Sequence, residues 1–335
     1  MTSKKVTELY NTVLQRSVQF SGKTAISGRL LQYELICKPV ASVYPVCFCG
    51  TTAPLSMQRL TQRPIHRSIQ QENPIVIFDS GVGGLSIYQE VKRRLPGIEV
   101  IYCADNEAFP YGPKPEAEVI DRTLYCLSQL AEQYQPSLAI IACNTASTIS
   151  LPRARQTLQI PVVGVVPAIK PAGEWSKKRS IGLLATPGTI AREYTHQLIR
   201  DFARDCDVIS VGSSELVEMA ERHLREQPVS HEEYKTVVEP FFANGKQPDC
   251  IVLGCTHFPL LEQQLQAACP APIHWINSGE AIARRVEFLL DTVPDSRTPT
   301  SDRFIYTGSP DGIHALMPAL ESMGFQEVHE LEQGS

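Results

Sequence analysis

The sequence contains no long apolar run and no export signal. No stretch approaches the ~18–20 consecutive apolar residues that a membrane-spanning helix needs, so we expect no membrane-embedded segment. The first residues, MTSKKVTELYNTVLQ, lack the apolar part of a secretory signal peptide. We therefore expect a cytoplasmic protein.

The composition also lacks the extremes that mark fibrous or disordered chains. Hydrophobic residues make up 43% and charged residues 20% of the 335 residues, and 20 residues are glycine. These values are ordinary for a globular protein and exclude collagen, a coiled-coil rod and a wholly disordered chain. At roughly 100–200 residues per domain, the length predicts two domains.

The ten cysteines lack the spacing of a metal site. Cys47 and Cys49 have the form of half a zinc site, but no matching Cys/His pair lies nearby. In a reducing cytoplasm most cysteines are free and buried as small hydrophobic residues. No lysine lies in a context typical of a Schiff base, so we expect chemistry without a metal or cofactor.

Acidic residues are scarce at the start of the chain. Residues 1–73 hold nine Lys/Arg against three Asp/Glu, and the first aspartate is Asp79. The remainder holds 22 Lys/Arg against 33 Asp/Glu, so the body is acidic although the net charge is only −5. Such a body is a poor partner for nucleic acid, because phosphate contacts need clustered cations. Residues 1–73 are predicted to be a largely flexible extension.

From residue 74 onward, short apolar runs alternate with helical stretches. The runs suit buried parallel strands, so the pattern predicts α/β architecture with helices covering the sheets. The predicted strands span residues 75–78, 99–103, 138–142, 162–165, 180–184, 207–211, 250–253 and 274–276. The predicted helices span residues 85–94, 115–133, 146–158, 190–204, 216–225, 234–243, 260–268 and 280–290. Ligands in such folds bind beyond the carboxyl ends of the strands, so functional residues should follow each run.

The segment Asp79-Ser-Gly-Val-Gly-Gly84 follows the first predicted strand and begins the first helix. Glycines there let the backbone approach a ligand, and free amides at a helix start bind anions. A small carboxylate ligand, a dinucleotide and a simple tight turn all remain open. The dinucleotide motif needs G-x-G-x-x-G, which this spacing fits badly.

Two cysteines occupy equivalent places in a weak internal sequence repeat. The stretch IIACNT contains Cys143 and the stretch VLGCT contains Cys255, each after an apolar strand. A strand end that leads into a helix start favours a reactive thiolate. His257 lies two residues beyond Cys255, on the same side of an extended backbone, so a Cys/His pair is plausible. The two contexts predict two facing half-sites.

The loop Phe109-Pro-Tyr-Gly-Pro113 follows the second predicted strand. A rigid turn explains its composition. The functional interpretation is a wall of the pocket, with Tyr111 and the Gly112 amide facing a ligand.

Residues 74 to about 290 strongly resemble the glutamate racemase family. The stretches that carry the resemblance are VIFDSGVGGLS, AFPYG, ACNTAS, VVGVVPAIKPA, GLLATPGTI and VLGCTHFPLL. The resemblance implies two similar parallel-sheet α/β domains with the active site in the cleft between them. The chain would cross over, giving a first domain of residues 74–166 plus 276–335 and a second of residues 167–275.

The family activity is the cofactor-independent racemisation of L- and D-glutamate for peptidoglycan synthesis. Inverting Cα needs proton removal on one face and return on the other, and two opposed bases do this most simply. The resemblance implies that Cys143 deprotonates D-glutamate and Cys255 deprotonates L-glutamate. It also implies that Asp79 and His257 assist the thiols, and that Glu221 supplies a further carboxylate.

The same resemblance assigns substrate binding and candidate partners. Residues implied in binding are Asp79, Ser80, Tyr111, Gly112, Asn144, Thr145, Thr256 and His257, with Thr186 and Thr189 as second-tier candidates. Some relatives are activated by UDP-N-acetylmuramoyl-L-alanine, and residues 58–74 are our hypothesis for such control. Some relatives inhibit DNA gyrase, which makes gyrase a candidate partner, and we expect this chain to be a monomer or a homodimer.

Three other functions stay open at this point. A racemase for aspartate or another acidic amino acid shares the same chemistry. A binding protein without catalysis is the second, and a cysteine hydrolase built on Cys255 and His257 is the third. The hydrolase leaves Cys143 unexplained.

Overall fold

The computed structural model describes residues 73–245, 247–290 and 300–331. All of these residues belong to one compact unit, Pro64–Ser335. The Cys47/Cys49 pair and almost all of the extension predicted to be flexible lie outside the described residues. The eight predicted strands are confirmed, each within one residue at either end.

The first sheet has six strands, all parallel, in the order β10-β9-β2-β1-β3-β4. Its strands are β1 (Ile75–Asp79), β2 (Val100–Ala104), β3 (Leu138–Ile141), β4 (Val162–Gly164), β9 (Asp302–Tyr306) and β10 (Phe325–Glu330). The last two strands come from the C-terminal part of the chain, after the whole second sheet.

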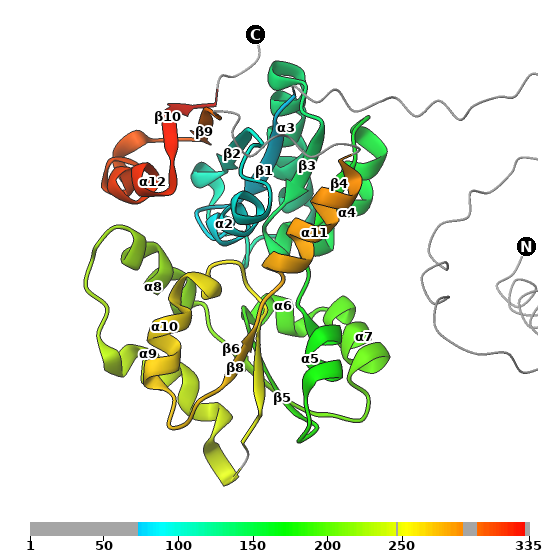
Figure 1. Ribbon diagram of the computed structural model, residues 1–335, viewed down its shortest axis with the longest axis vertical. Coiled ribbons are helices and arrows are strands. Elements are labelled where there is room, and N and C mark those ends of the chain that lie inside the picture. The colour runs from blue at the N-terminus through cyan, green and yellow to red at the C-terminus, as the bar shows by residue number, and fades with distance from the viewer. Residues whose placement is uncertain (1–72, 246, 291–299, 332–335) are drawn as a thin grey trace, which may run out of the picture. The chain divides into compact units, whose positions relative to one another are not determined.

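The second sheet has four parallel strands in the order β6-β5-β7-β8. They are β5 (Ser180–Ala185), β6 (Asp207–Gly212), β7 (Cys250–Leu253) and β8 (His274–Ile276). Parallel strands need crossover connections, and helices supply them here. Figure 1 shows the two sheets with their helices.

Helices cover both faces of the first sheet because alternate strand residues are apolar on both sides. The helices are α2 (Leu85–Arg94), α3 (Glu116–Tyr134), α4 (Asn144–Thr157), α11 (Gly279–Leu289) and α12 (Met317–Met323). In β1, Ile75 and Ile77 pack in the cluster that includes α2 and α11 residues, whereas Val76 and Phe78 pack with α3 and α4 residues. The first sheet is therefore the central layer of three.

The second sheet follows the same rule. Its helices are α5 (Ile169–Trp175), α6 (Pro187–Ala191), α7 (Glu193–Phe202), α8 (Glu215–Leu224), α9 (His231–Val238) and α10 (Glu262–Ala268). Leu184 packs with residues of α8, α9 and α10, whereas its neighbour Leu183 packs with residues of α5 and α7. Figure 1 shows these two helix groups on opposite sides of the strands.

The structure corrects the helices predicted over residues 190–204 and 234–243, the second of which is α9 over His231–Val238, and it adds elements that the sequence did not predict. The helix predicted over residues 190–204 is interrupted at Arg192, whose backbone is extended (φ −74°, ψ 137°). The Thr195 hydroxyl donates to the Thr189 carbonyl at 2.6 Å, which satisfies that carbonyl without a continuous helix. Strands β9 and β10 and helices α5 and α12 were not predicted.

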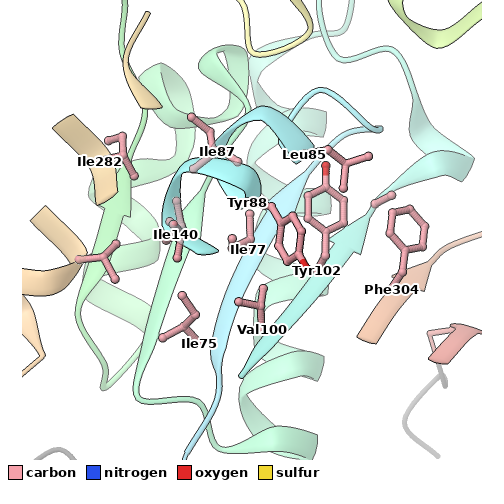
Figure 2. Packing of buried hydrophobic residues seen from close by; sticks show 14 of the residues in the cluster. Ile75, Ile77, Leu85, Ile87, Tyr88, Val100, Tyr102, Ile140, Ile282 and Phe304 are labelled. Carbon is pink, nitrogen blue, oxygen red and sulfur yellow. The ribbon is translucent and has the colours of Figure 1, made fainter. Parts of the chain in front are cut away.

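A buried carboxylate joins β9 to the rest of the first sheet. Asp302 accepts hydrogen bonds from the Tyr88 hydroxyl at 2.8 Å and from the Val100 amide at 3.0 Å, and it pairs with Lys92 at 3.0 Å. Beside it, Phe304 stacks on Tyr102 with ring centroids 5.2 Å apart (Figure 2). These contacts make the C-terminal strands part of the core.

In the part of the chain that the structure describes, no helix is both long and apolar enough to cross a bilayer. The same residues include no group of three or more His, Cys, Asp or Glu side chains placed to hold a metal ion.

Replacing Phe304 by Ala should destabilise the fold strongly. The side chain is 0% exposed, so Phe304→Ala leaves a cavity between β9 and β2 and lowers the free energy of unfolding by about 3–5 kcal/mol. Urea unfolding measures this as a lower midpoint. Phe288→Ala is the matched control, because Phe288 is 76% exposed and its loss should change stability by about 0.5 kcal/mol or less. Equal midpoints for the two variants would contradict the proposed packing.

Candidate active site

A cavity of about 420 Å³ lies between loops that follow strands of the two sheets. Most of its lining comes from five segments. The residues that line the cavity are Ser80, Phe109, Pro110, Tyr111, Gly112, Pro113, Cys143, Asn144, Thr145, Thr186, Pro187, Gly188, Thr189, Ser214, Val217, Glu218, Cys255, Thr256 and His257. The carboxyl ends of parallel strands meet here, as expected for a ligand site in this class of fold.

Cys143 follows β3 and forms the N-cap of α4. Its sulfur accepts from the Ala146 amide at 3.5 Å and lies 3.6 Å from the Ser80 hydroxyl. Burial, together with the nearby Asp79 carboxylate, raises the pKa of the Cys143 thiol to about 12, although both hydrogen bonds act in the opposite direction. The resting side chain is therefore a thiol, able to give a proton.

Cys255 follows β7 and has a different set of partners. Its sulfur lies 3.8 Å from His257 Nδ1, and the other ring nitrogen, Nε2, lies 2.9 Å from Glu221 Oε1. Arg225 pairs with the second oxygen of Glu221 at 2.5 Å. The four side chains form a continuous polar chain from the cavity into helix α8.

The charges in this chain stabilise one another. Burial alone would lower the pKa of His257, but contacts with Cys255 and Glu221 outweigh it and hold that pKa well above its usual range. Burial alone would raise the pKa of Glu221, but His257 and Arg225 hold that pKa below its usual range. His257 is therefore a protonated imidazole beside Cys255, able to donate a hydrogen bond to a thiolate.

Asp79 lies behind the cavity rather than in its wall. Its carboxylate is fully buried and accepts from the Gly81 amide at 2.7 Å and the Thr256 hydroxyl at 3.2 Å. Burial raises the pKa of Asp79, while His257 acts in the opposite direction. The Thr256 contact joins the loop after β1 to the loop after β7.

Two glycines of the loop after β1 are needed because protein side chains approach them closely. A Cβ at Gly83 would lie 2.3 Å from His257 Nδ1, and one at Gly81 would lie 2.9 Å from Glu221 Oε1. The Val82 amide also donates to Glu221 at 3.3 Å. The glycines predicted from the sequence to approach a ligand thus approach His257 and Glu221 instead.

The loop after β2 forms another part of the wall. Tyr111 and Gly112 both line the cavity, as the functional interpretation of this loop predicted. The Tyr111 hydroxyl donates to the buried Asp105 at 2.6 Å, and Asp105 also accepts from Thr307 at 2.6 Å. Neither Asp105 nor Thr307 was predicted, and Thr307 lies just after the unpredicted strand β9.

The start of α4 offers donors to a ligand. Asn144 and Thr145 line the cavity, and Asn144 Nδ2 is buried with no hydrogen-bond partner among the described residues. A buried amide without a partner costs free energy, so a ligand acceptor at this position would be stabilised. Thr186 and Thr189 also line the cavity, with their hydroxyls 2.9 Å apart.

The structure brings the predicted residues together in two layers. Ser80, Tyr111, Gly112, Cys143, Asn144, Thr145, Cys255, Thr256 and His257 line the cavity. Asp79 and Glu221 contact these residues from behind. Ser214, Val217 and Glu218 of the α8 region line the cavity but were missed, because their segment SSELVEMAE carries no signal beyond an amphipathic helix.

This arrangement is suited to moving protons. Two thiols from loops of different sheets share one cavity; one is held as a thiol and the other lies beside a protonated imidazole. Neither thiol needs a metal or an external base to carry a proton.

Comparisons with known proteins identify the family of this chain. The family described as Asp/Glu/Hydantoin racemase matches residues 75–286. A glutamate racemase of Escherichia coli K12 is 44% identical over 258 residues, covering 77% of this chain and 90% of the relative. One from Pectobacterium carotovorum is 42% identical over 281 residues, covering 84% and 99%.

Solved structures give the same result. A crystal structure of Escherichia coli glutamate racemase, in complex with L-glutamate and the activator UDP-MurNAc-Ala, superposes with a TM-score of 0.74 at 44% identity, covering 78% of this chain and all of the other. Glutamate racemase isoform RacE1 from Bacillus anthracis superposes with a TM-score of 0.66 at 28% identity, covering 78% and 98%. The chain therefore belongs to the Asp/Glu/Hydantoin racemase family, within its glutamate racemase group, and is an isomerase.

Proposed function

We propose that this chain interconverts L- and D-glutamate by proton transfer at Cα between Cys143 and Cys255, and thereby supplies D-glutamate for peptidoglycan. The observation that carries the proposal is the pair of thiols in one cavity, each following a strand of a different sheet. The substrate assignment rests on the relatives, which are named glutamate racemases.

The proposed step from L- to D-glutamate begins at Cys255. Its thiolate, hydrogen-bonded by the protonated His257, takes the proton from Cα, and the electron pair of the broken C–H bond stays on the substrate. The Cys143 thiol then gives its proton to the opposite face of Cα. The cycle leaves Cys255 as a thiol and Cys143 as a thiolate, and the reverse reaction starts from that state.

The negative charge that develops on the substrate needs donors near its α-carboxylate. The unpartnered Asn144 Nδ2 and the Thr145 hydroxyl line the same cavity and are proposed to bind that carboxylate. Donors that are already in place stabilise the transition state more than mobile water does. Ser80, Tyr111 and Gly112 complete the proposed binding site.

The division into domains is part of the proposal. Residues 74–166 with 276–335 would form one domain and residues 167–275 the other. The strand pairing supports this division. Strand β9 pairs with β2, and β10 pairs with β9, so both C-terminal strands belong to the first sheet. The cavity would then be a cleft between the domains.

Control by a cell-wall precursor is also proposed. The Escherichia coli relative was solved with the activator UDP-MurNAc-Ala, and 44% identity to it supports the same activator here. The residues suggested for this control, 58–74, lie almost entirely outside the described residues. The racemisation assay described next, with the precursor added, tests this proposal.

Loss of either thiol should stop racemisation. Cys143→Ala and Cys255→Ala each remove one of the two proton carriers, so the rate with L-glutamate should fall roughly a thousandfold or more. Circular dichroism of glutamate in cofactor-free buffer measures the rate. Cys250→Ala is the matched control, because Cys250 lies in β7 but packs in the core with α5. A variant that loses Cys143 or Cys255 and keeps full activity would contradict the two-thiol proposal.

The Glu221→Gln variant should change the pH dependence. Without the carboxylate, burial favours neutral His257, so the pKa of the ring falls and its proton is lost at lower pH. In a plot of kcat/KM for glutamate against pH, the fall at alkaline pH should begin about one pH unit or more lower than in the wild type. Racemisation measured between about pH 6 and 10 tests this.

Glu215→Gln is the control for that experiment. Glu215 lies in the same helix and its carboxylate is bonded to Ser213 rather than to a histidine. The pH profile of kcat/KM for this variant should match that of the wild type at alkaline pH. An unshifted profile in Glu221→Gln would show that Glu221 does not hold the proton on His257.

A further inference from the structure

Arg192 is a half-buried cation, and two of its donor atoms have no partner among the described residues. It lies at the junction of α6 and α7, where its extended backbone ends one helix and begins the next. Its Nε and Nη1 atoms are buried and have no hydrogen-bond partner among the described residues. Leaving guanidinium donors unpaired in a buried place costs free energy, so the protein keeps this arrangement at the expense of stability.

The guanidinium lies next to the wall of the cavity. A Cβ built on Gly188, which lines the cavity, would lie 3.8 Å from Arg192 Nη1 and 3.1 Å from the Gly112 carbonyl oxygen. Gly112 also lines the cavity, on the side of the first sheet. Gly188 therefore has no side chain to separate the cation from the cavity.

The carboxylates in and behind the cavity wall would repel an anionic substrate, and a nearby cation offsets that repulsion. Among the described residues that line the cavity, Glu218 is acidic, His257 is cationic but already paired with Glu221, and none is Lys or Arg. Asp79 and Glu221 add carboxylates behind the wall, and Arg225 is already paired with Glu221. An acidic amino acid carries a net charge of −1 and must enter these surroundings.

Burial lowers the pKa of Arg192, but its charge interacts favourably with Glu116 and with the anionic form of Cys143. The guanidinium therefore lies within electrostatic reach of the cavity. It keeps its charge at neutral pH, as guanidinium groups in proteins do.

On the basis of the function proposed above, we propose that Arg192 attracts acidic amino acids into the cavity and helps to select them over neutral ones. Its unpartnered guanidinium supplies the positive potential that draws in a substrate of net negative charge. Arg192 acts from behind Gly188 and does not take part in the proton transfer. It is a specificity-determining residue rather than a catalytic one.

The test is steady-state racemisation of glutamate by Arg192→Gln and Arg192→Lys in the full-length chain. In Arg192→Gln the KM for L-glutamate should rise roughly tenfold while kcat stays within about twofold of the wild type. Arg192→Lys keeps the charge and should restore most of the loss. Added salt should raise the KM of the wild type but have little effect on Arg192→Gln, because salt screens this attraction.

Arg200→Gln is the matched control. Arg200 lies in α7 as well, but it pairs with Glu193 at the surface, so its loss changes the net charge equally and should leave KM unchanged. The melting temperature of Arg192→Gln should not fall below that of the wild type, because the guanidinium donors that it removes are unpaired.

Several results would overturn the proposal. They are an unchanged KM in Arg192→Gln, an equal rise in Arg200→Gln, a fall in kcat alone, and a variant that fails to fold. A wild type that does not racemise glutamate at all would instead refute the proposed function, so the two failures are distinguishable.

Discussion

The structure depends on a buried polar network that joins the loop after β1 and the start of α2 to the loop after β7 and to α8. Asp79 accepts from Thr256, the Ser86 hydroxyl donates to the Thr256 carbonyl at 2.7 Å, and the Val82 amide donates to Glu221. These bonds join a loop of the first sheet to a loop and a helix that follow strands of the second. Because every partner is buried or half-buried, loss of one leaves another unsatisfied, which fixes the two loops in a single arrangement.

That network also makes the two thiols chemically different. Cys143 lies at a helix start, close to the buried Asp79, and burial raises its pKa. Cys255 lies beside His257, whose proton is held by Glu221. The thiols occupy similar places after parallel strands, and only their neighbours separate a proton donor from a proton acceptor. A reaction that removes a proton from one face of a carbon and returns one to the other needs one thiolate and one thiol at a time.

The sequence predicts much of this site because its residues follow apolar strands. Cys143 and Cys255 each follow a buried run, and parallel strands bring such positions to one edge. Asp105 and Thr307, which support Tyr111, could not be predicted, because the bond between them joins residues 202 positions apart. Strand β9 starts with Asp302 and Arg303, which hide it from apolar patterning, and its pairing with β2 is tertiary. The break at Arg192 was missed because it depends on a local hydroxyl bond within a helical pattern.

The proposed two-thiol mechanism can be tested by isotope incorporation in early turnover. The wild-type enzyme converts protiated L-glutamate in deuterated water, and mass spectrometry of the separated enantiomers follows deuterium at the α-carbon while little substrate has reacted. With two bases, D-glutamate should contain deuterium at this carbon while the remaining L-glutamate contains almost none, because the proton taken by Cys255 is not the one given by Cys143. Deuterium appearing equally in both enantiomers from the start would indicate a single base and contradict the mechanism.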